Sequence, residues 1–247
     1  MRSALQIGAA TAAFGIIHSL LASRGAKNFT ARLVGEQRRD AAYRVFYNAQ
    51  AIATFGPVLG YGSRLPERTL YRVQGPAAGM LRGAQAAGLV WAYRAAREVG
   101  ILRLAGMTNL HAYLRGEPMP QGPAAQGPER QETGALSTGG PFRWSRHPLN
   151  LAPLPVFWLT PHLTTRRLAF NLVATAYLVL GSLHEERRLR SLYGSDYETY
   201  QRSGVPFFLP LFSPPGILPP GRSRPPRTDA DRRITPAVPT PPETPDR

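Results

Sequence analysis

The sequence predicts an all-α fold, a polytopic membrane helix bundle of about five transmembrane helices. Apolar segments of membrane length recur up to residue 183, and most basic residues lie between them. About 20 apolar residues are enough to cross the hydrocarbon core of a bilayer. The net charge is +15, and its spread over the connecting segments is typical of cytoplasmic loops rather than of a nucleic-acid-binding face. The absence of cysteine excludes a disulfide framework, a cysteine zinc site and a cysteine nucleophile.

Five segments are predicted to cross the membrane: residues 4–22, 45–61, 76–96, 148–160 and 168–183. The first has a second interpretation as a secretory signal peptide. The third contains two arginines, so an amphipathic helix lying on the membrane surface is its alternative. Its many glycines and alanines favour close helix packing within a membrane. Pro153 and Pro155 predict a kink in the fourth segment, because each removes a backbone donor.

The basic residues predict which loops face the cytoplasm. With the N-terminus outside and five spans, residues 23–44, residues 97–147 and the C-terminal region lie inside and hold twenty-two of the thirty Lys and Arg residues. Six lie outside, so the reverse orientation would violate the positive-inside rule. We therefore expect an integral protein, in a bacterial inner membrane, with its N-terminus outside and its C-terminal region in the cytoplasm.

The C-terminal region is predicted to contain a charged helix and a tail. Residues 185–201 predict a cytoplasmic amphipathic helix, ended by Gly204-Val205-Pro206. Beyond Phe212 the chain is rich in Pro and Arg, so disorder is expected. Loop 116–141, rich in Gly, Pro and Gln, is a candidate lid or a disordered segment. The predicted divisions are a membrane domain at residues 1–212, whose part at about 136–210 holds the charged motifs described next, and a disordered tail at residues 213–247.

Charged motifs flank the last two apolar segments. Arg146-His147-Pro148 opens the fourth segment and Glu185-Glu186 follows the fifth, so a helical hairpin would bring both motifs to one membrane face. Charged groups beside hydrocarbon are costly and tend to be kept where they do chemistry. Proline suits the first turn of a helix, Ser145 is expected to cap that helix, and its N-terminus would attract an anion. A membrane-entry signal with a snorkelling arginine is the alternative.

Adjacent glutamates point about 100° apart on a helix. Glu185 and Glu186 are therefore not expected to face one site together. One is expected to face the pocket, and the other to pair with Arg188 or Arg190. A solvated helix end is the alternative.

The histidines do not predict a metal site. His184-Glu185-Glu186 lacks the second histidine of the zinc-protease helix. His18, His111 and His162 are most simply packed polar residues. A proton relay or a haem ligand is the alternative for His18, within the first segment.

Two sets of residues carry a resemblance to known membrane enzymes. The first is Gly140, Phe142, Arg146-His147-Pro148, Glu185-Glu186, Leu189, Tyr193-Gly194, Tyr197, Tyr200 and Val205-Pro206. In this order it resembles the catalytic half of the integral-membrane methyltransferases that include isoprenylcysteine carboxyl methyltransferase and phospholipid methyltransferases. The second is His18-Ser19, Ala22-Ser23, Lys27, Tyr43-Arg44, Tyr47-Asn48, Phe157-Trp158 and Thr160-Pro161. It is similar to the methanethiol S-methyltransferases and NnrU-type membrane proteins. Isoprenylcysteine enzymes commonly carry a tyrosine where this chain has Asn150, which counts against a prenylated substrate.

The resemblance implies methyl transfer from S-adenosylmethionine to a small thiol or another small lipophilic nucleophile. It implies cofactor-binding roles for Gly140, Phe142, His147, Pro148, Glu185, Glu186, Tyr197 and Tyr200. Arg146 and His18 are the expected catalytic residues, Arg146 to lower the pKa of a thiol and His18 to accept its proton. The expected partners are the methyl acceptor and membrane lipid, and not nucleic acid. The alternatives are an isoprenylcysteine carboxyl or phospholipid methyltransferase, and a non-enzymatic NnrU-type protein that binds haem.

Overall fold

The computed structural model describes residues 2–120, 126–128, 130–131 and 134–208. The predicted tail, 213–247, lies outside these residues, as does part of loop 116–141. The described chain is mostly helical, as predicted. Its elements in order are α1 (Arg2–Ala22), α2 (Arg24–Val34), α3 (Glu36–Arg64), β1 (Thr69–Arg72), α4 (Gly75–Val99), α5 (Ile101–Ala105), α6 (Met107–Leu114), η1 (Gly140–Arg143), α7 (Pro148–Leu151), α8 (Pro153–Trp158), β2 (His162–Thr164), α9 (Thr165–Tyr193) and α10 (Ser195–Arg202).

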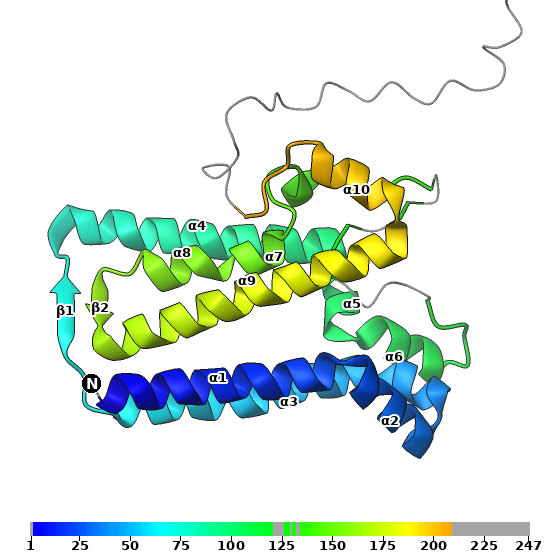
Figure 1. Cartoon of the computed structure of the whole chain (residues 1–247), viewed down its shortest axis with the longest axis horizontal. Coiled ribbons are helices and arrows are strands. Elements are labelled where there is room, and N and C mark those ends of the chain that lie inside the picture. Colours follow the sequence, from blue (N-terminus) through cyan, green and yellow to red (C-terminus); the bar gives the residue numbers. More distant parts are fainter. Residues whose placement is uncertain (1, 121–125, 129, 132–133, 209–247) are drawn as a thin grey trace, which may run out of the picture.

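The long helices α1, α3, α4 and α9 form the body of the molecule (Figure 1). α1 packs against both α9 and α3, and α4 packs against α8. A Cβ on Gly15 would lie 2.9 Å from the Tyr177 ring, and one on Gly62 would lie 2.8 Å from Ile7. Glycine at these positions therefore allows the helix backbones to approach closely, as is typical of helix bundles within membranes.

The two ends of the bundle differ in character. The chain start and the β1–β2 pair lie at one end in Figure 1, and α2, α5, α6 and α10 lie at the other. Residues 23–44, helices α5 and α6 directly after α4, and helix α10 after α9 thus come to the same end. Which side of a membrane this end faces stays a prediction.

A two-stranded antiparallel sheet departs from the all-α prediction. Thr69 pairs with Thr164, and Arg72 pairs with His162. The strands are four and three residues long, too short to show an alternating pattern in the sequence. The all-α expectation is wrong at this end of the bundle, where the sheet joins the α3–α4 connection to the α8–α9 connection.

The predicted fourth span consists of two short helices. α7 ends at Leu151 and α8 begins at Pro153, so the interruption expected from proline is confirmed there. Side chains of neighbouring helices satisfy carbonyls near the end of α8. Asn171 Nδ2 of α9 donates to Phe157 O at 2.7 Å, and Gln85 Nε2 of α4 donates to Val156 O at 2.8 Å. Carbonyls of the last helical turn lack partners within the helix. These two side chains supply the missing hydrogen bonds, so the short helix does not leave those carbonyls unpaired inside the protein.

The prediction of one helix over residues 185–201 is wrong. α9 continues without interruption to Tyr193, and α10 begins at Ser195. Gly194 between them has a φ of +54°, which residues with a Cβ rarely adopt. The turn at Gly194 folds Tyr197 and Tyr200 into one buried apolar cluster with Phe142.

Two helices among the described residues, α1 and α9, are long and apolar enough by length and composition to cross a membrane. Their large apolar side chains are exposed on the protein: Leu5 by 72%, Leu20 by 62% and Leu180 by 65%. Extended apolar surface of this kind marks a contact with lipid or with another protein. The other predicted spans lie in α3, α4 and α7–α8, and the number five stays a prediction.

Candidate functional site

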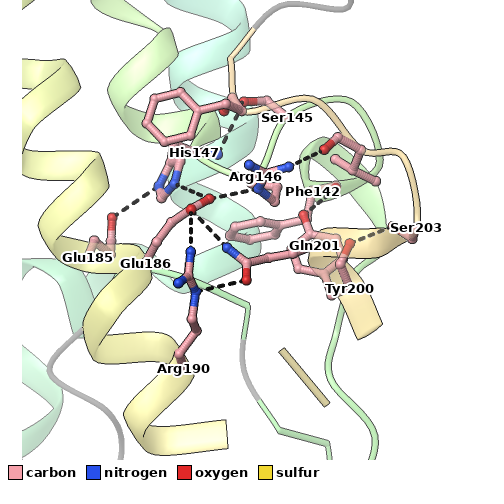
Figure 2. Close-up of polar contacts among 12 residues, drawn as sticks. Phe142, Ser145, Arg146, His147, Glu185, Glu186, Arg190, Tyr200, Gln201 and Ser203 are labelled. Carbon is pink, nitrogen blue, oxygen red and sulfur yellow. Dashed lines mark hydrogen bonds and ion pairs between the residues drawn. The ribbon is translucent and has the colours of Figure 1, made fainter. Parts of the chain in front are cut away.

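Four charged side chains meet beside the C-terminal turns of α9 (Figure 2). Arg146 and His147 come from the segment between η1 and α7, and Glu185 and Glu186 come from α9. Arg146 Nε donates to Glu186 Oε1 at 2.7 Å. His147 lies between the carboxylates, with Nδ1 3.4 Å from Glu185 Oε2 and Nε2 3.3 Å from Glu186 Oε1. These residues are termed the charged quartet below.

The segment after α10 holds Arg146 in place. The Arg146 backbone N donates to Pro206 O at 2.9 Å, and Nη1 of its side chain donates to Val205 O at 2.6 Å. A guanidinium presents several donors in one plane, so one side chain joins this segment to Glu186 of α9. The Val-Pro pair at the end of the motif therefore has a structural role as the backbone support of Arg146.

Ser145 anchors the same segment and does not cap α7. Its Oγ donates to Phe207 O at 3.1 Å and accepts from His147 N at 3.2 Å. His147 is the N-cap of α7 and makes no side-chain capping hydrogen bond, so the capping expectation for Ser145 is wrong. Pro148 does begin the helix, as predicted, but α7 is only four residues long. A helix this short offers little dipole to attract an anion.

Both glutamates take part in the quartet, which corrects the expectation that only one would face the site. Glu185 Oε1 also accepts from Gln126 N at 2.6 Å. Glu186 Oε2 accepts from Gln201 Nε2 at 2.8 Å and lies 3.6 Å from Arg190 Nη2. The glutamates diverge on the helix, but the imidazole ring between them presents one nitrogen to each. The partner at i+4 is Arg190, one of the two expected.

The position of His147 favours its protonated form. A neutral imidazole has one N–H, whereas both ring nitrogens here face carboxylate oxygens. Burial alone would lower the pKa of His147, but its hydrogen bonds to Glu185 and Glu186 raise that pKa above the ordinary value. With His147 protonated, the quartet holds two positive and two negative charges and is neutral as a unit.

Two tyrosines of α10 belong to the apolar cluster that contains Phe142. Tyr200 Oη donates to Phe142 O at 2.6 Å, and burial raises the pKa of this hydroxyl. Tyr197 is fully buried, and its hydroxyl has no hydrogen-bond partner in the described part of the chain. Buried hydroxyls are normally paired, so Tyr197 is an exception within the described part of the chain, and it lines neither of the cavities described next.

Two cavities lie next to this region. One of about 190 Å³ is lined by Glu98, Phe142 and residues between α6 and η1. The other is an open groove of about 430 Å³, lined by Glu98, Gly140 and further side chains of α4 and the 140–144 segment. Neither lining includes a quartet residue among those described. The quartet therefore lies outside both linings, and Gly140 and Phe142 are the motif residues that face the cavities.

Glu98 is a candidate site residue that the motifs did not reveal. It lines both cavities, and a Cβ on Gly140 would lie 2.8 Å from Glu98 Oε2. Gly140 also has a φ of +51°, so both backbone and space require glycine there. Glu98 is the only carboxylate between Glu67 and Glu117. The sequence feature that could have identified Glu98 is its position as a lone acidic residue just after the predicted third span.

His18 lies in a different environment, among α1, α3 and α9. Its ring centroid is 4.4 Å from that of Tyr47 and 6.4 Å from that of Tyr177, and Nδ1 is 3.3 Å from Gln50 Nε2. Gln50 Oε1 is buried without a partner among the described residues. Within that part of the chain no contact joins His18 to Arg146, so the two expected catalytic residues are not in direct contact.

Several curated methanethiol S-methyltransferases are similar to this chain. One from Pseudomonas deceptionensis is 32% identical over 111 residues, which are 45% of this chain and 41% of the relative. One from Mycobacterium tuberculosis is 39% identical over 69 residues, 28% of each. Methanethiol S-methyltransferase 1 of Bradyrhizobium diazoefficiens is 25% identical over 192 residues, 77% of this chain and 61% of the relative.

These similarities span less than two thirds of the length of each of these relatives. No family model matches the chain, and no solved structure matches it. The relatives nevertheless bear one name, and the longest of the three similarities covers most of this chain. In sequence the chain is therefore methanethiol S-methyltransferase-like.

Proposed function

We propose that this protein is an integral-membrane methyltransferase that moves a methyl group from S-adenosylmethionine to a small thiol. The observation that carries the proposal is the likeness to several methanethiol S-methyltransferases. The exposed apolar surfaces of α1 and α9 support a membrane location. The basic-residue distribution supports an external N-terminus and a cytoplasmic catalytic half at about 136–210.

The residues beside the cavities fit such a cofactor, which has a carboxylate, an ammonium, a ribose and a sulfonium. Glu98 makes no hydrogen bond or ion pair with another described residue, so its oxygens are available to a ribose or an ammonium. Tyr197 adds an unused buried hydroxyl. The proposed cofactor-binding set is Gly140, Phe142, His147, Pro148, Glu185, Glu186, Tyr197 and Tyr200, joined by Glu98. Bound S-adenosylmethionine supplies the electrophilic methyl group.

The task of the protein is to align the acceptor and to take its proton. An in-line displacement requires mainly that donor and nucleophile be aligned. We assign proton acceptance to His18. Its Nδ1 faces the Gln50 amide, and when the amide oxygen accepts from Nδ1–H, Nε2 keeps a lone pair that accepts the thiol proton. The orientation of such an amide follows from its hydrogen bonds.

Basic groups near His18 suit a thiolate. Arg44 lies on α3 one turn before Tyr47, whose ring centroid is 4.4 Å from that of His18. Burial, followed by repulsion from Arg188 and Arg44, lowers the pKa of the Lys27 ammonium, which supports a concentration of positive charge between α2, α3 and α9. A positive surrounding lowers the pKa of a thiol. Arg146, occupied by Glu186 and Val205, is assigned a positioning role.

The test uses full-length protein purified in detergent. We expect saturable binding of S-adenosylmethionine by calorimetry and release of dimethyl sulfide when methanethiol is added. Glu98→Gln is expected to weaken cofactor binding about tenfold, because a charge-assisted hydrogen bond is lost. Glu117→Gln, an exposed carboxylate 4.0 Å from Arg115, is the matched control. A folded wild-type protein that does not bind the cofactor would overturn the proposal. Turnover of prenyl-cysteine but not of thiols would identify an isoprenylcysteine carboxyl methyltransferase instead.

A further inference from the structure

We propose that the groove between α4 and η1 binds the phosphate of an anionic phospholipid at the membrane surface. Its lining combines three arginines and two tryptophans: Arg94, Arg97, Arg143, Trp91 and Trp144. Glu98, Gly140 and Pro141 complete it. The proposal rests on the membrane location proposed above. Glu98 and Gly140 also belong to the proposed cofactor-binding set, so the lipid phosphate is assigned to the arginine side of the groove.

Among the described residues, none is a counter-ion of these arginines. The Arg94 and Arg143 side chains make no hydrogen bond or ion pair with any described residue, and the contact of Arg97 is with the Tyr93 ring at 6.0 Å. By contrast, Arg146 lies 2.7 Å from a carboxylate oxygen. Of the described residues that line the groove, Glu98 alone is a carboxylate, so this lining carries an excess of positive charge. Clustered like charges repel one another unless an anion lies between them.

The position of the groove along α4 matches the edge of a bilayer. α4 begins at Gly75, beside the β1–β2 end of the bundle. At 1.5 Å per residue, Trp91 lies about 24 Å and Arg97 about 33 Å along the helix. The hydrocarbon core is about 30 Å thick. With Gly75 at the opposite face, Trp91 lies in the last turns of hydrocarbon, Arg94, about 28 Å along the helix, lies at the hydrocarbon boundary, and Arg97 lies at the level of the lipid headgroups.

The tryptophans favour a lipid over a free anion. Trp91 Nε1 donates to Pro148 O at 3.1 Å, which fixes its ring as one wall of the groove. Trp144 is 63% exposed. Indole rings prefer the boundary between hydrocarbon and water, and basic pockets at the cytoplasmic ends of helices bind anionic lipid headgroups. Free phosphate would use the arginines and leave both rings without a role.

The experiment titrates detergent-purified, full-length protein and follows tryptophan fluorescence. The probes are dihexanoyl phosphatidylglycerol, dihexanoyl phosphatidylcholine and inorganic phosphate. We expect saturable binding of phosphatidylglycerol, at least about tenfold tighter than that of the other two. The triple variant Arg94→Gln, Arg97→Gln, Arg143→Gln is expected to lose at least about tenfold in affinity. A control triple variant at exposed positions of α2 and α3, Arg24→Gln, Arg32→Gln, Arg38→Gln, removes the same charge and is expected to keep wild-type affinity.

Equal losses in the two triple variants would show non-specific attraction and overturn the proposal. Phosphate binding as tight as that of the lipid would do the same, since it would identify a free-anion site. If the groove triple variant fails to fold by circular dichroism, the single variant Arg143→Gln replaces it, with about a fivefold loss expected; unchanged affinity would then reject the site. Flotation of wild-type protein with vesicles tests the membrane location separately. Flotation without a groove effect rejects only the lipid site, and no flotation rejects the membrane location itself.

Discussion

The charged quartet and the region around His18 differ in the contacts that hold their polar side chains. In the quartet every charged side chain faces one of opposite charge, and the partners are 39 or 40 residues apart in the sequence for His147–Glu186 and Arg146–Glu186. His18 lies among aromatic rings and contacts one neutral amide, that of Gln50. One region is held by ionic contacts between distant segments, and the other by ring packing between helices.

This difference determines what a substitution in each region can show. A buried ion that loses its partner is left uncompensated, which destabilises the fold whatever the residue does in catalysis. Loss of activity in a quartet variant therefore does not identify a chemical role. His18 can be replaced without stranding a charge, so a variant there reports more directly on the reaction.

The largest expected effect is loss of stability in Glu186→Gln. Its carboxylate is 7% exposed and is shared by Arg146 and His147, so removing the charge leaves two buried cations with one fewer partner. We expect unfolding free energy to fall by about 3 kcal/mol, measured by chemical denaturation in detergent. Glu198→Gln breaks an exposed pair with Arg202 and is expected to change stability by less than about 0.5 kcal/mol. Similar small losses of unfolding free energy in both variants would show that the ion pairs of the quartet do not stabilise the fold.

His18→Gln is expected to lower kcat for thiol methylation at least about a hundredfold, because a general base is removed. Its unfolding free energy should change by less than about 1 kcal/mol. Headspace measurement of dimethyl sulfide and the same denaturation assay give the two numbers. His111→Gln, an exposed histidine of α6, should affect neither. A loss of stability as large as that of Glu186→Gln would instead give His18 a packing role.

Gly194→Ala tests the turn that places α10 against the quartet. Its φ of +54° is strained for alanine, so we expect a loss of about 2 kcal/mol in unfolding free energy. The control is Gly181→Ala within α9, where a Cβ would meet no atom within 4 Å. Alanine is the better helix former there by about 1 kcal/mol, so the control is expected to be neutral or more stable. Equal outcomes would show that the turn tolerates a side chain.

The smallest expected effect is the pH dependence due to His147. Its folded-state pKa is raised above the ordinary 6.5, so protonation stabilises the fold. This contribution is complete below the unfolded-state pKa and is lost as pH rises through the folded-state pKa. Wild-type unfolding free energy should therefore decline above about pH 6.5, measured by denaturation from pH 6 to 9. In His147→Gln the decline should shrink, and an identical profile in both proteins would contradict a protonated His147.

The predictions from sequence held where the cause is local. Proline has no backbone donor, so the start of α7 at Pro148 and the break before Pro153 follow from residue type alone. The predictions failed where a contact joins distant segments. The sheet pairs Thr69 with Thr164, Ser145 bonds to Phe207, and His147 reaches both glutamates. No periodicity within a segment reports such contacts.

The helical character of the chain, its apolar segments and the two charged motifs could be predicted from the sequence, because side-chain chemistry and spacing act over a few residues. The tertiary structure was needed to show that the quartet residues pair with one another, that Glu98 faces the cavities and that three arginines of one groove have no ion-pair partner among the described residues. Whether a charge is paired depends on which groups other helices bring within about 4 Å, the range over which ion pairs form. The distance between two charged groups on different helices depends on how the helices pack, and it cannot be predicted from the sequence of one segment.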